Sequence, residues 1–382
     1  MQALISIPKD KSVVVQEVPK PKPGPTEILV KVHAVALNHV DAIYAKFPIA
    51  AQDVRTIGSD FAGEVVEIGA DLQGITDPRA IEGARVAGFV QGACSVNERP
   101  GAFAEYLAID MDLTWSVPDQ MPYEDAATIS LCGLTAAQAV FDRLQLPCPF
   151  RQTEGFGGLT LKPNELVNVF IYGATSSLGL YAAQLVRKAE QASGTKVRLL
   201  GAASAAKHAQ LQQTPYNYDV LVDYKDPEWP IEIRKATGKQ GGVQYALDAV
   251  SQGQTVSLVE STIGVQGRFA AFRSPALGGF RIDELRIKPI LGAVWEGLGA
   301  EIVYQGGAVI PANSEARQFA AEFYKYLGLV GIVPNPTRRM SGGLANIPNE
   351  GFSLLGAWGD KEATAREHLR PISGEKIVYT VS

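Results

Sequence analysis

The chain of 382 residues is too long for one ordinary hydrophobic core and suits two domains. Hydrophobic residues make up 46% of it and charged residues 20%, which excludes both a disordered and a membrane-embedded protein. The formal net charge is −5 and there is no dense basic block. We therefore expect no nucleic-acid partner and no membrane-surface partner.

The N-terminal segment and the cysteines indicate the compartment. The first 20 residues lack the uninterrupted apolar stretch of a signal peptide and carry two lysines and an aspartate by residue 11. Cys94, Cys132 and Cys148 form no CxxC pair, which favours a reducing compartment over a disulfide framework. No apolar run approaches the roughly 20 residues of a membrane span. We expect a cytoplasmic protein.

Short strands and turns are predicted for about the first 110 residues. Segments 4–7 and 12–15 form a predicted hairpin, and a proline-rich turn covers 19–25. Residues 27–38 alternate in polarity over much of their length, as a half-buried strand does. Glycines bound two further strands, within 58–69 and 83–88.

After Pro122 the pattern changes. Residues 124–141 are rich in alanine and leucine and predict one or two helices, and the proline- and glycine-rich stretch 147–163 is typical of an insertion or linker. From residue 165 strands and helices alternate, which predicts a parallel sheet with helices on both faces. The expected strands are 167–172, 196–200, 220–222, 243–248 and 268–272, and the expected helices are 178–191 and 207–213.

The last 70 residues or so hold a predicted helix at 314–327 and a terminal strand at 375–381. Short strands at both ends of the chain indicate that the C-terminus returns to complete the first domain. We therefore expect an α/β fold in which 1–135 and 312–382 form a β-rich domain. Residues 136–311 would form the doubly wound parallel-sheet domain.

The strongest local signal is the segment VFIYGATSSLG at 169–179, where a buried strand runs into a turn of small residues and then a helix. Such a turn lets the backbone approach a phosphate, and the free N–H groups of the helix start favour an anion. Gly173 makes the turn and Gly179 lets the helix pack near the sheet. Ser176 stands where many dinucleotide folds have glycine, and it can itself donate to phosphate. A generic tight turn is the alternative, which the surrounding βαβ pattern disfavours.

The end of the next strand distinguishes the two nicotinamide dinucleotides. NAD-binding proteins usually have an acidic residue there, about 20 residues after the first glycine. Residues 196–207 contain no aspartate or glutamate, whereas Ser204 and Lys207 are suited to a 2′-phosphate. NADPH is therefore the expected cofactor, and the alternative for Lys207 is a solvated charge at a helix start.

No metal site is expected. Neither the three cysteines nor the four histidines (His33, His39, His208 and His368) form a cluster with zinc-ligand spacing. Cys94 and Cys132 are interpreted as small apolar residues and not as nucleophiles. The chemistry is predicted to be metal-free.

Five segments follow one another along the chain: ALN-x-x-D at 36–41, GSDFAGEV at 58–65, GARVAG at 83–88, GAFAEY at 101–106 and SGEK at 373–376. In this order they resemble the medium-chain dehydrogenase/reductase superfamily, and they are most similar to its zinc-free branch of quinone oxidoreductases and enoyl reductases. The resemblance implies a GroES-like β-rich catalytic domain at 1–135 and 312–382. It also implies a Rossmann-type cofactor domain at 136–311.

Two further segments, KPILGAVWEG at 288–297 and IPANSEAR at 310–317, narrow the resemblance. They are similar to the fungal trans-acting enoyl reductases that serve polyketide synthases. That family implies a monomeric enzyme that uses NADPH to reduce an enoyl thioester held on an acyl carrier protein.

The resemblance also implies a set of cofactor-binding residues. Those at the nicotinamide end of the cleft would be Asp41, Phe272, Arg273, Ile372 and Ser373. Those at the phosphates and the adenosine would be Gly173, Thr175, Ser176, Ser177, Leu178, Ser204, Lys207 and Tyr224.

The implied reaction is hydride delivery to the β-carbon of a double bond conjugated to a carbonyl. Thr135 is the candidate hydrogen-bond donor to the carbonyl oxygen, and Tyr44 or Lys46 is the candidate proton source for the α-carbon. Where relatives carry a polar residue just after the Asp41 motif, this chain has apolar ones. Solvent is therefore an alternative proton source.

The substrate cleft is expected between the domains. Its candidate residues are Leu134 and Thr135 on one wall and Leu291, Gly292 and Val294 on another. The apolar segment 291–294 suits an acyl chain, and it suits a core or interface strand equally well.

Two other functions stay open from the sequence. One is a free-standing quinone, enone or aldehyde reductase, and the other is an NADPH-binding protein without redox turnover. Quinone-reductase relatives often dimerise edge to edge through their cofactor-domain sheets, and the strand for such an edge is expected near 291–295. We favour a monomer, in which Pro289 and the residues after it keep that edge out of reach.

Overall fold

The computed structural model describes residues 1–48, 54–92, 99–152, 156–157, 166–304, 307, 309–356 and 369–381. Cys94 and His368 lie outside this part of the chain. Two compact units divide the chain: Met1–Leu131 with Trp295–Ser382, and Cys132–Val294. The sequence analysis puts the corresponding boundaries at 135 and 312. The second boundary differs because Trp295 is buried against Phe89 of the first unit, with ring centroids 6.0 Å apart.

The first unit is built on a seven-stranded sheet in the order β16–β17–β3–β5–β6–β8, with β7 paired to β3. The strands are β3 (Glu27–Ala36), β5 (Asp60–Ile68), β6 (Arg85–Phe89), β7 (Tyr106–Asp110), β8 (Thr114–Ser116), β16 (Thr337–Met340) and β17 (Lys376–Thr380). A second sheet contains β1 (Gln2–Ile7), β2 (Ser12–Glu17) and β4 (Arg55–Thr56), and a third pairs β14 (Ile302–Val303) with β15 (Val309–Ile310). The helices are α1 (His39–Lys46), α2 (Tyr123–Ala126), α9 (Ser314–Val330), α10 (Gly343–Asn346) and α11 (Phe352–Leu354).

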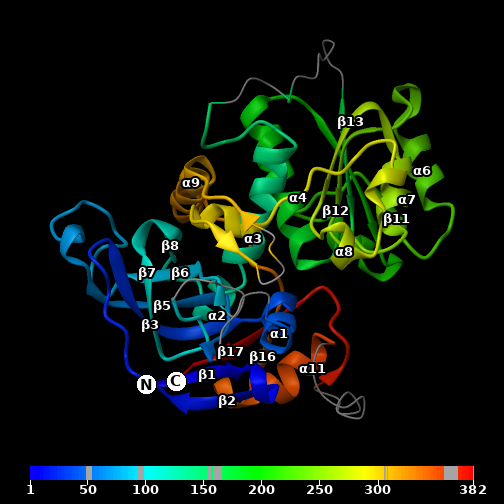
Figure 1. Ribbon diagram of the computed structural model, residues 1–382. Coiled ribbons are helices and arrows are strands. Elements are labelled where there is room, and N and C mark those ends of the chain that lie inside the picture. Colours follow the sequence, from blue (N-terminus) through cyan, green and yellow to red (C-terminus); the bar gives the residue numbers. More distant parts are fainter. Residues whose placement is uncertain are drawn as a thin grey trace. The chain divides into compact units, whose positions relative to one another are not determined.

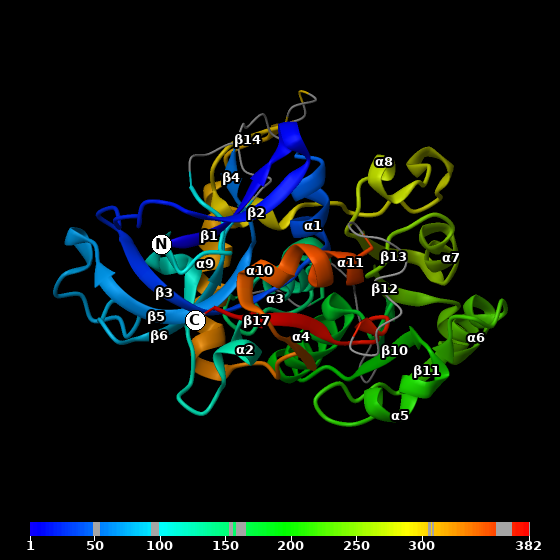
Figure 2. The ribbon, with the colours of Figure 1, turned by 90° about the horizontal axis from the view of Figure 1, so that it is seen from below.

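The predicted return of the C-terminus to the first domain is confirmed. β17 pairs antiparallel with β3, in the register Val378↔Ala36, and the two strands lie side by side in Figure 2. On its other side β17 pairs with the edge strand β16. The predicted N-terminal hairpin is confirmed as well, because β1 and β2 pair antiparallel with Leu4 opposite Val15. Strands from the two ends of the chain therefore build one unit.

The second unit contains a fully parallel five-stranded sheet in the order β11–β10–β9–β12–β13. The strands are β9 (Val167–Tyr172), β10 (Val197–Ala203), β11 (Val220–Asp223), β12 (Val243–Asp248) and β13 (Ile263–Ala271). The main helices are α3 (Ser130–Ala137), which begins in the first unit, and α4 (Ser177–Ser193), α5 (His208–Leu211), α6 (Trp229–Ala236), α7 (Thr255–Ser261) and α8 (Pro275–Gly278).

The strand order explains the two helical layers. Right-handed crossovers put the helix that leads from β9 to β10 on one face, and those that lead from β11 to β12 and from β12 to β13 on the other. Figure 1 shows α4 on one side of the sheet and α6 and α7 on the opposite side. Every residue of β9 is buried, as expected of a central parallel strand. The predicted doubly wound parallel sheet is confirmed.

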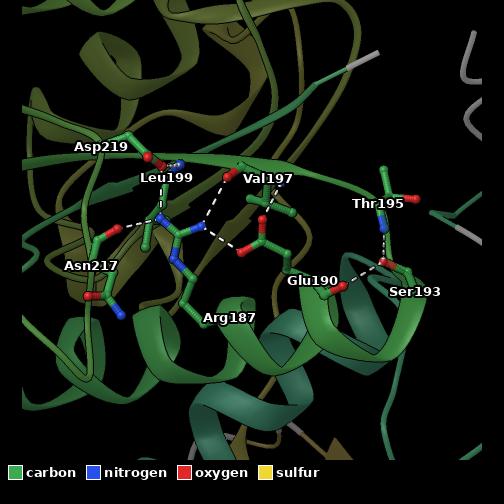
Figure 3. Close-up of polar contacts among 8 residues, drawn as sticks. All are labelled: Arg187, Glu190, Ser193, Thr195, Val197, Leu199, Asn217 and Asp219. Atoms are coloured by element: carbon green, nitrogen blue, oxygen red, sulfur yellow. Dashed lines mark hydrogen bonds and ion pairs between the residues drawn. The ribbon is translucent and has the colours of Figure 1, made fainter. Parts of the chain in front are cut away.

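A polar cluster fixes the end of the sheet opposite to the carboxyl ends of its strands (Figure 3). Arg187 of α4 contacts Glu190 Oε2 at 2.8 Å, Asp219 Oδ2 at 2.8 Å and the carbonyl of Asn217. The two carboxylates in turn accept the backbone N–H groups of Val197 and Leu199, at 3.0 and 2.7 Å. The cluster thus ties the C-terminal half of α4 to β10 and to the segment before β11.

Two sequence expectations for this unit are wrong. The strand expected near 291–295 does not form: Ile290 makes a single parallel bridge to Ala270, and residues 294–298 form a 3₁₀ helix. Pro289 has no N–H to continue a ladder. The described part of 147–163 is also no unpacked linker, since Phe156 is buried with its ring 6.2 Å from that of Tyr245.

Candidate active site

The turn of small residues at 173–178 is the segment that the sequence predicts to bind a phosphate, and it is called the phosphate turn below. Gly173 adopts φ +73°, which is costly for other residues, and a Cβ on Gly179 would collide with the carbonyl of Gly173. The Ser176 hydroxyl caps α4 by accepting the N–H of Gly179 at 3.0 Å. The amides of Thr175 and Leu178 have no hydrogen-bond partner among the described residues. The half-buried turn 175–178 therefore offers free donors, which fits a pyrophosphate.

Strands β10 and β11 bring the predicted 2′-phosphate residues beside an acid. Ser204 follows β10 and opens a 3₁₀ helix that ends at Lys207, whose ammonium makes no hydrogen bond or ion pair in the described part of the chain. Asp223 ends β11 opposite Ala203, and its Oδ2 accepts the N–H of Ala205 at 3.4 Å. Tyr224 follows and is 44% exposed.

Asp223 is not among the predicted site residues, because it lies outside the stretch 196–207 in which an acid is expected from the chain order. The available signal was the parallel pairing, which brings the ends of neighbouring strands to one edge of the sheet. The negative charge of Asp223 opposes the binding of a phosphate beside Ser204 and Lys207.

Phe272 and Arg273, the predicted nicotinamide contacts of this unit, are half-buried at the end of β13. The N–H of Phe272 donates to Ser251 Oγ at 2.9 Å, and the Ser251 hydroxyl donates to the carbonyl of Asp248 at 2.5 Å. Burial raises the pKa of Asp248, which accepts the amide of Ser251. The segment after β12 thus fixes the backbone from which Phe272 and Arg273 project.

In the first unit, α1 carries Asp41, Tyr44 and Lys46. Asp41 is buried and completes a capping box: its Oδ2 accepts the Asn38 N–H at 2.7 Å, and its Oδ1 accepts the Ser59 hydroxyl at 2.6 Å. Burial raises the pKa of Asp41 to about 7, although both hydrogen bonds act to lower it. The structure gives this carboxylate a capping role, and its contact with the cofactor stays a prediction. Tyr44 and Lys46 lie half-buried in the following turn.

A buried ion pair joins the start of α1 to the C-terminal strand. Lys376 Nζ lies 2.8 Å from Asp60 Oδ2 and 2.7 Å from Asn38 Oδ1. Asn38 Nδ2 also donates to Asp60 Oδ2, at 2.9 Å. The structure therefore brings α1 close to the segment with Ile372 and Ser373, which directly precedes Lys376. Ile372 is half-buried and Ser373 exposed.

The predicted substrate residues differ in their surroundings. Leu134 is fully buried in α3, whereas Thr135 is half-buried. Leu291 packs on the hydrophobic core of the parallel-sheet unit, and Val294 is buried. The backbone of Gly292 lies against the Arg143 guanidinium, so any side chain there would collide with it. These contacts favour the core alternative for Leu291, and the substrate roles of all five residues stay predictions.

Within the described residues, no group of three or more histidine, cysteine, aspartate or glutamate side chains is arranged to hold a metal ion. No helix in the same ranges is long and apolar enough to cross a membrane.

Comparison with known proteins gives consistent matches. Residues 24–119 match the alcohol dehydrogenase GroES-like domain. The trans-enoyl reductase traG of Penicillium crustosum is 31% identical, over 99% of this chain and 96% of its own. The crystal structure of the CurK enoyl reductase superposes with a TM-score of 0.68 at 15% identity, covering 100% and 99% of the two chains. A mycobacterial protein complexed with NADPH gives 0.65 at 21% identity and full coverage of both chains.

A GroES-like unit followed by a doubly wound parallel sheet is the fold of the medium-chain dehydrogenase/reductase superfamily. Within that superfamily, the 31% identity with a trans-enoyl reductase extends over nearly the whole length of both chains and identifies the family. The chain belongs to the trans-enoyl reductase family and is an enoyl reductase.

The raised pKa of Asp41 predicts a pH-dependent stability. In the unfolded chain this carboxyl ionises near pH 4, whereas in the folded protein it holds its proton up to about pH 7. Its contribution to folding is therefore complete below pH 4 and is lost as the pH rises to about 7. Asp41→Asn keeps the shape without the titration. Its stability relative to wild type should rise by on the order of 3 kcal/mol between pH 4 and pH 8, measured by urea unfolding.

Asp71→Asn is the matched control, because Asp71 is an exposed aspartate in the same unit. Its unfolding, measured at the same pH values, gives the effect of an exposed Asp→Asn change against which that of Asp41→Asn is compared. A pH-independent difference between Asp41→Asn and wild type would contradict a raised pKa at this buried carboxyl.

Proposed function

We propose that the chain is a trans-acting enoyl reductase that uses NADPH to reduce an α,β-unsaturated thioester carried by a polyketide synthase. The observation that carries the proposal is the phosphate turn with its free amides in a member of this family. We further propose that the parallel-sheet unit holds the cofactor and the GroES-like unit is the catalytic domain. The protein would act as a cytoplasmic monomer, with no nucleic-acid or membrane partner.

The residues suited to hold the cofactor follow the ends of four strands. The amides of Thr175 and Leu178 and the hydroxyls of Ser176 and Ser177 would bind the pyrophosphate. Lys207, which has no anionic partner among the residues that the structure describes, would bind the 2′-phosphate with Ser204, and this supports NADPH. Tyr224 would pack by the adenosine, and Phe272 and Arg273 would contact the nicotinamide half. The bound cofactor would supply hydride to the substrate β-carbon.

Hydride addition leaves an enolate, and the protein must stabilise it and deliver a proton. The Thr135 hydroxyl would donate to the thioester oxygen as its charge develops. Tyr44 or Lys46 on α1 would then give a proton to the α-carbon, so that hydride and proton together saturate the double bond. Asp41 would act indirectly, because its carboxylate caps the helix that carries both candidates.

The substrate proposal predicts a preference between two acceptors. NADPH oxidation should be substrate-dependent with a short α,β-unsaturated pantetheine thioester and near background with a simple quinone.

Thr135→Val removes the proposed donor with little change in volume and should lower kcat for the thioester about 10²-fold, with little effect on NADPH binding.

Two other outcomes of the same assay would indicate a different function. Quinone reduction without thioester reduction would make the protein a free-standing quinone or enone reductase. Measurable NADPH binding with no turnover of either acceptor would favour a non-catalytic cofactor-binding protein. Either result would overturn the proposal.

Lys207 and Asp223 carry opposite charges near the proposed 2′-phosphate site, so their removal should change the KM for NADPH in opposite directions. Lys207→Ala removes a charge-assisted contact to the 2′-phosphate and should raise the KM for NADPH about 10- to 100-fold, leaving that for NADH unchanged. Asp223→Asn removes a like charge and should lower the KM for NADPH several-fold. Lys235→Ala, an exposed lysine on α6, is the control. Equal effects of Lys207→Ala on both cofactors would exclude its phosphate role.

A further inference from the structure

Arg338 contacts both ends of the loop 370–375, which contains Ile372 and Ser373, two of the proposed nicotinamide contacts. Arg338 Nη1 donates to the carbonyl of Arg370 at 2.6 Å, and its Nη2 donates to the carbonyl of Pro371 at 3.1 Å. The same Nη2 pairs with Glu375 Oε1 at the other end of the segment. A single guanidinium thus binds both the beginning and the end of this loop.

Arg338 can do this because of its place in the sheet. It lies on β16, the edge strand, and pairs in parallel register with Ile377 of β17. Its side chain is 9% exposed, so the contacts replace water almost completely. A guanidinium presents several donors in a fixed planar fork, whereas an ammonium has one charged point, and lysine would not bridge the same three acceptors.

Glu375 organises the middle of the loop. Its Oε1 accepts the N–H of Ser373 at 3.4 Å, and its two oxygens accept a bidentate pair from Arg370 at 2.7 and 3.0 Å. Burial alone would raise the pKa of Glu375, but hydrogen bonds from Arg338 and Arg370 outweigh it and lower the pKa to about 2. The carboxylate therefore stays charged at any pH at which the enzyme works.

No regular secondary structure fixes this loop. Residues 370–375 lie outside every helix and strand, and the strand ladder begins only at Lys376. Lys376 is in turn held by its buried contacts with Asp60 and Asn38. The conformation of Ile372 and Ser373 therefore depends on side-chain contacts made by their neighbours.

We propose that Arg338 and Glu375 are positioning residues that set the conformation of Ile372 and Ser373 before the nicotinamide half of the cofactor binds. Neither charged side chain needs to touch the cofactor. An ordered loop avoids the entropy cost of ordering it on binding, so affinity for the whole cofactor depends on this ion pair. The inference rests on the proposed function, in which Ile372 and Ser373 contact the nicotinamide half.

The test compares two ligands on the full-length protein. NADPH uses both halves of the proposed site, whereas 2′,5′-ADP contains only the adenosine half. Arg338→Lys keeps the charge and loses the fork, and Glu375→Gln keeps the shape and loses the charge. Each should weaken NADPH binding about 5- to 20-fold, measured by nicotinamide fluorescence, and leave 2′,5′-ADP binding within twofold, measured by calorimetry.

A neighbouring arginine provides the control. Arg339 lies on the same strand, is largely exposed and contacts Glu124 and Asp125 at 3.7 Å. Arg339→Gln should leave both affinities within twofold of wild type. The double variant Arg338→Lys/Glu375→Gln should bind NADPH no more than about twofold more weakly than the worse single variant, because each change alone already breaks the contact between Arg338 and Glu375.

Several results would overturn the inference, and they differ from failure of the proposed function. NADPH binding that is unchanged in both single variants excludes a positioning role, as does an equal loss for NADPH and 2′,5′-ADP, which indicates general destabilisation. Additive losses in the double variant exclude coupling through the pair. Wild-type protein that binds neither ligand would instead refute the cofactor proposal itself.

Discussion

The buried ion pair between Asp60 and Lys376 is the interaction on which the first unit depends. The two side chains are 0% and 1% exposed, so both charges lose nearly all of their hydration. Such a pair is tolerable only where the remaining polar atoms also find partners. Here Asn38 bonds to both charged groups, and Asp60 Oδ1 accepts the N–H of Leu131 at 2.7 Å.

This network joins four segments that are far apart in the sequence. It fixes the start of α1, the first residue of β5, the second residue of α3 and the first residue of β17. The proposed proton donors on α1 and the loop before β17 therefore share one anchor. Removing either charge would leave the other buried without an opposite charge, which typically costs several kcal/mol.

In the parallel-sheet unit, the common direction of the strands, and not a buried ion pair, brings the predicted site residues together. Because all five strands run the same way, the residues that follow them meet at one edge without any buried charge pair. That is why the turn at 173–178 and Ser204 could be predicted as phosphate contacts from the ends of strands, whereas only the resemblance to known enzymes implies Tyr224 and Phe272. The charged cluster around Arg187 lies at the opposite end of the strands, where it braces the sheet away from the proposed cofactor.

The sequence predicts features that depend on neighbouring residues better than contacts between residues far apart in the chain. Patterns with a short range, such as the strand, turn and helix at 167–193, could be read correctly because neighbouring residues determine them. The partners of Asp41, Asp60 and Arg338 could not, since Asp60 and Lys376 stand 316 positions apart and no periodicity links them. The expected strand at 291–295 failed for a related reason, because its apolar residues serve packing rather than a ladder.

Transfer of hydride to the β-carbon is tested most directly with NADPH deuterated at C4, each epimer being used separately with a short α,β-unsaturated pantetheine thioester. The proposed mechanism predicts one deuterium at the β-carbon of the product from one epimer and none from the other. With unlabelled NADPH in D₂O, the label should appear at the α-carbon. Deuterium at the carbonyl carbon, or a saturated product without label from either epimer, would contradict it.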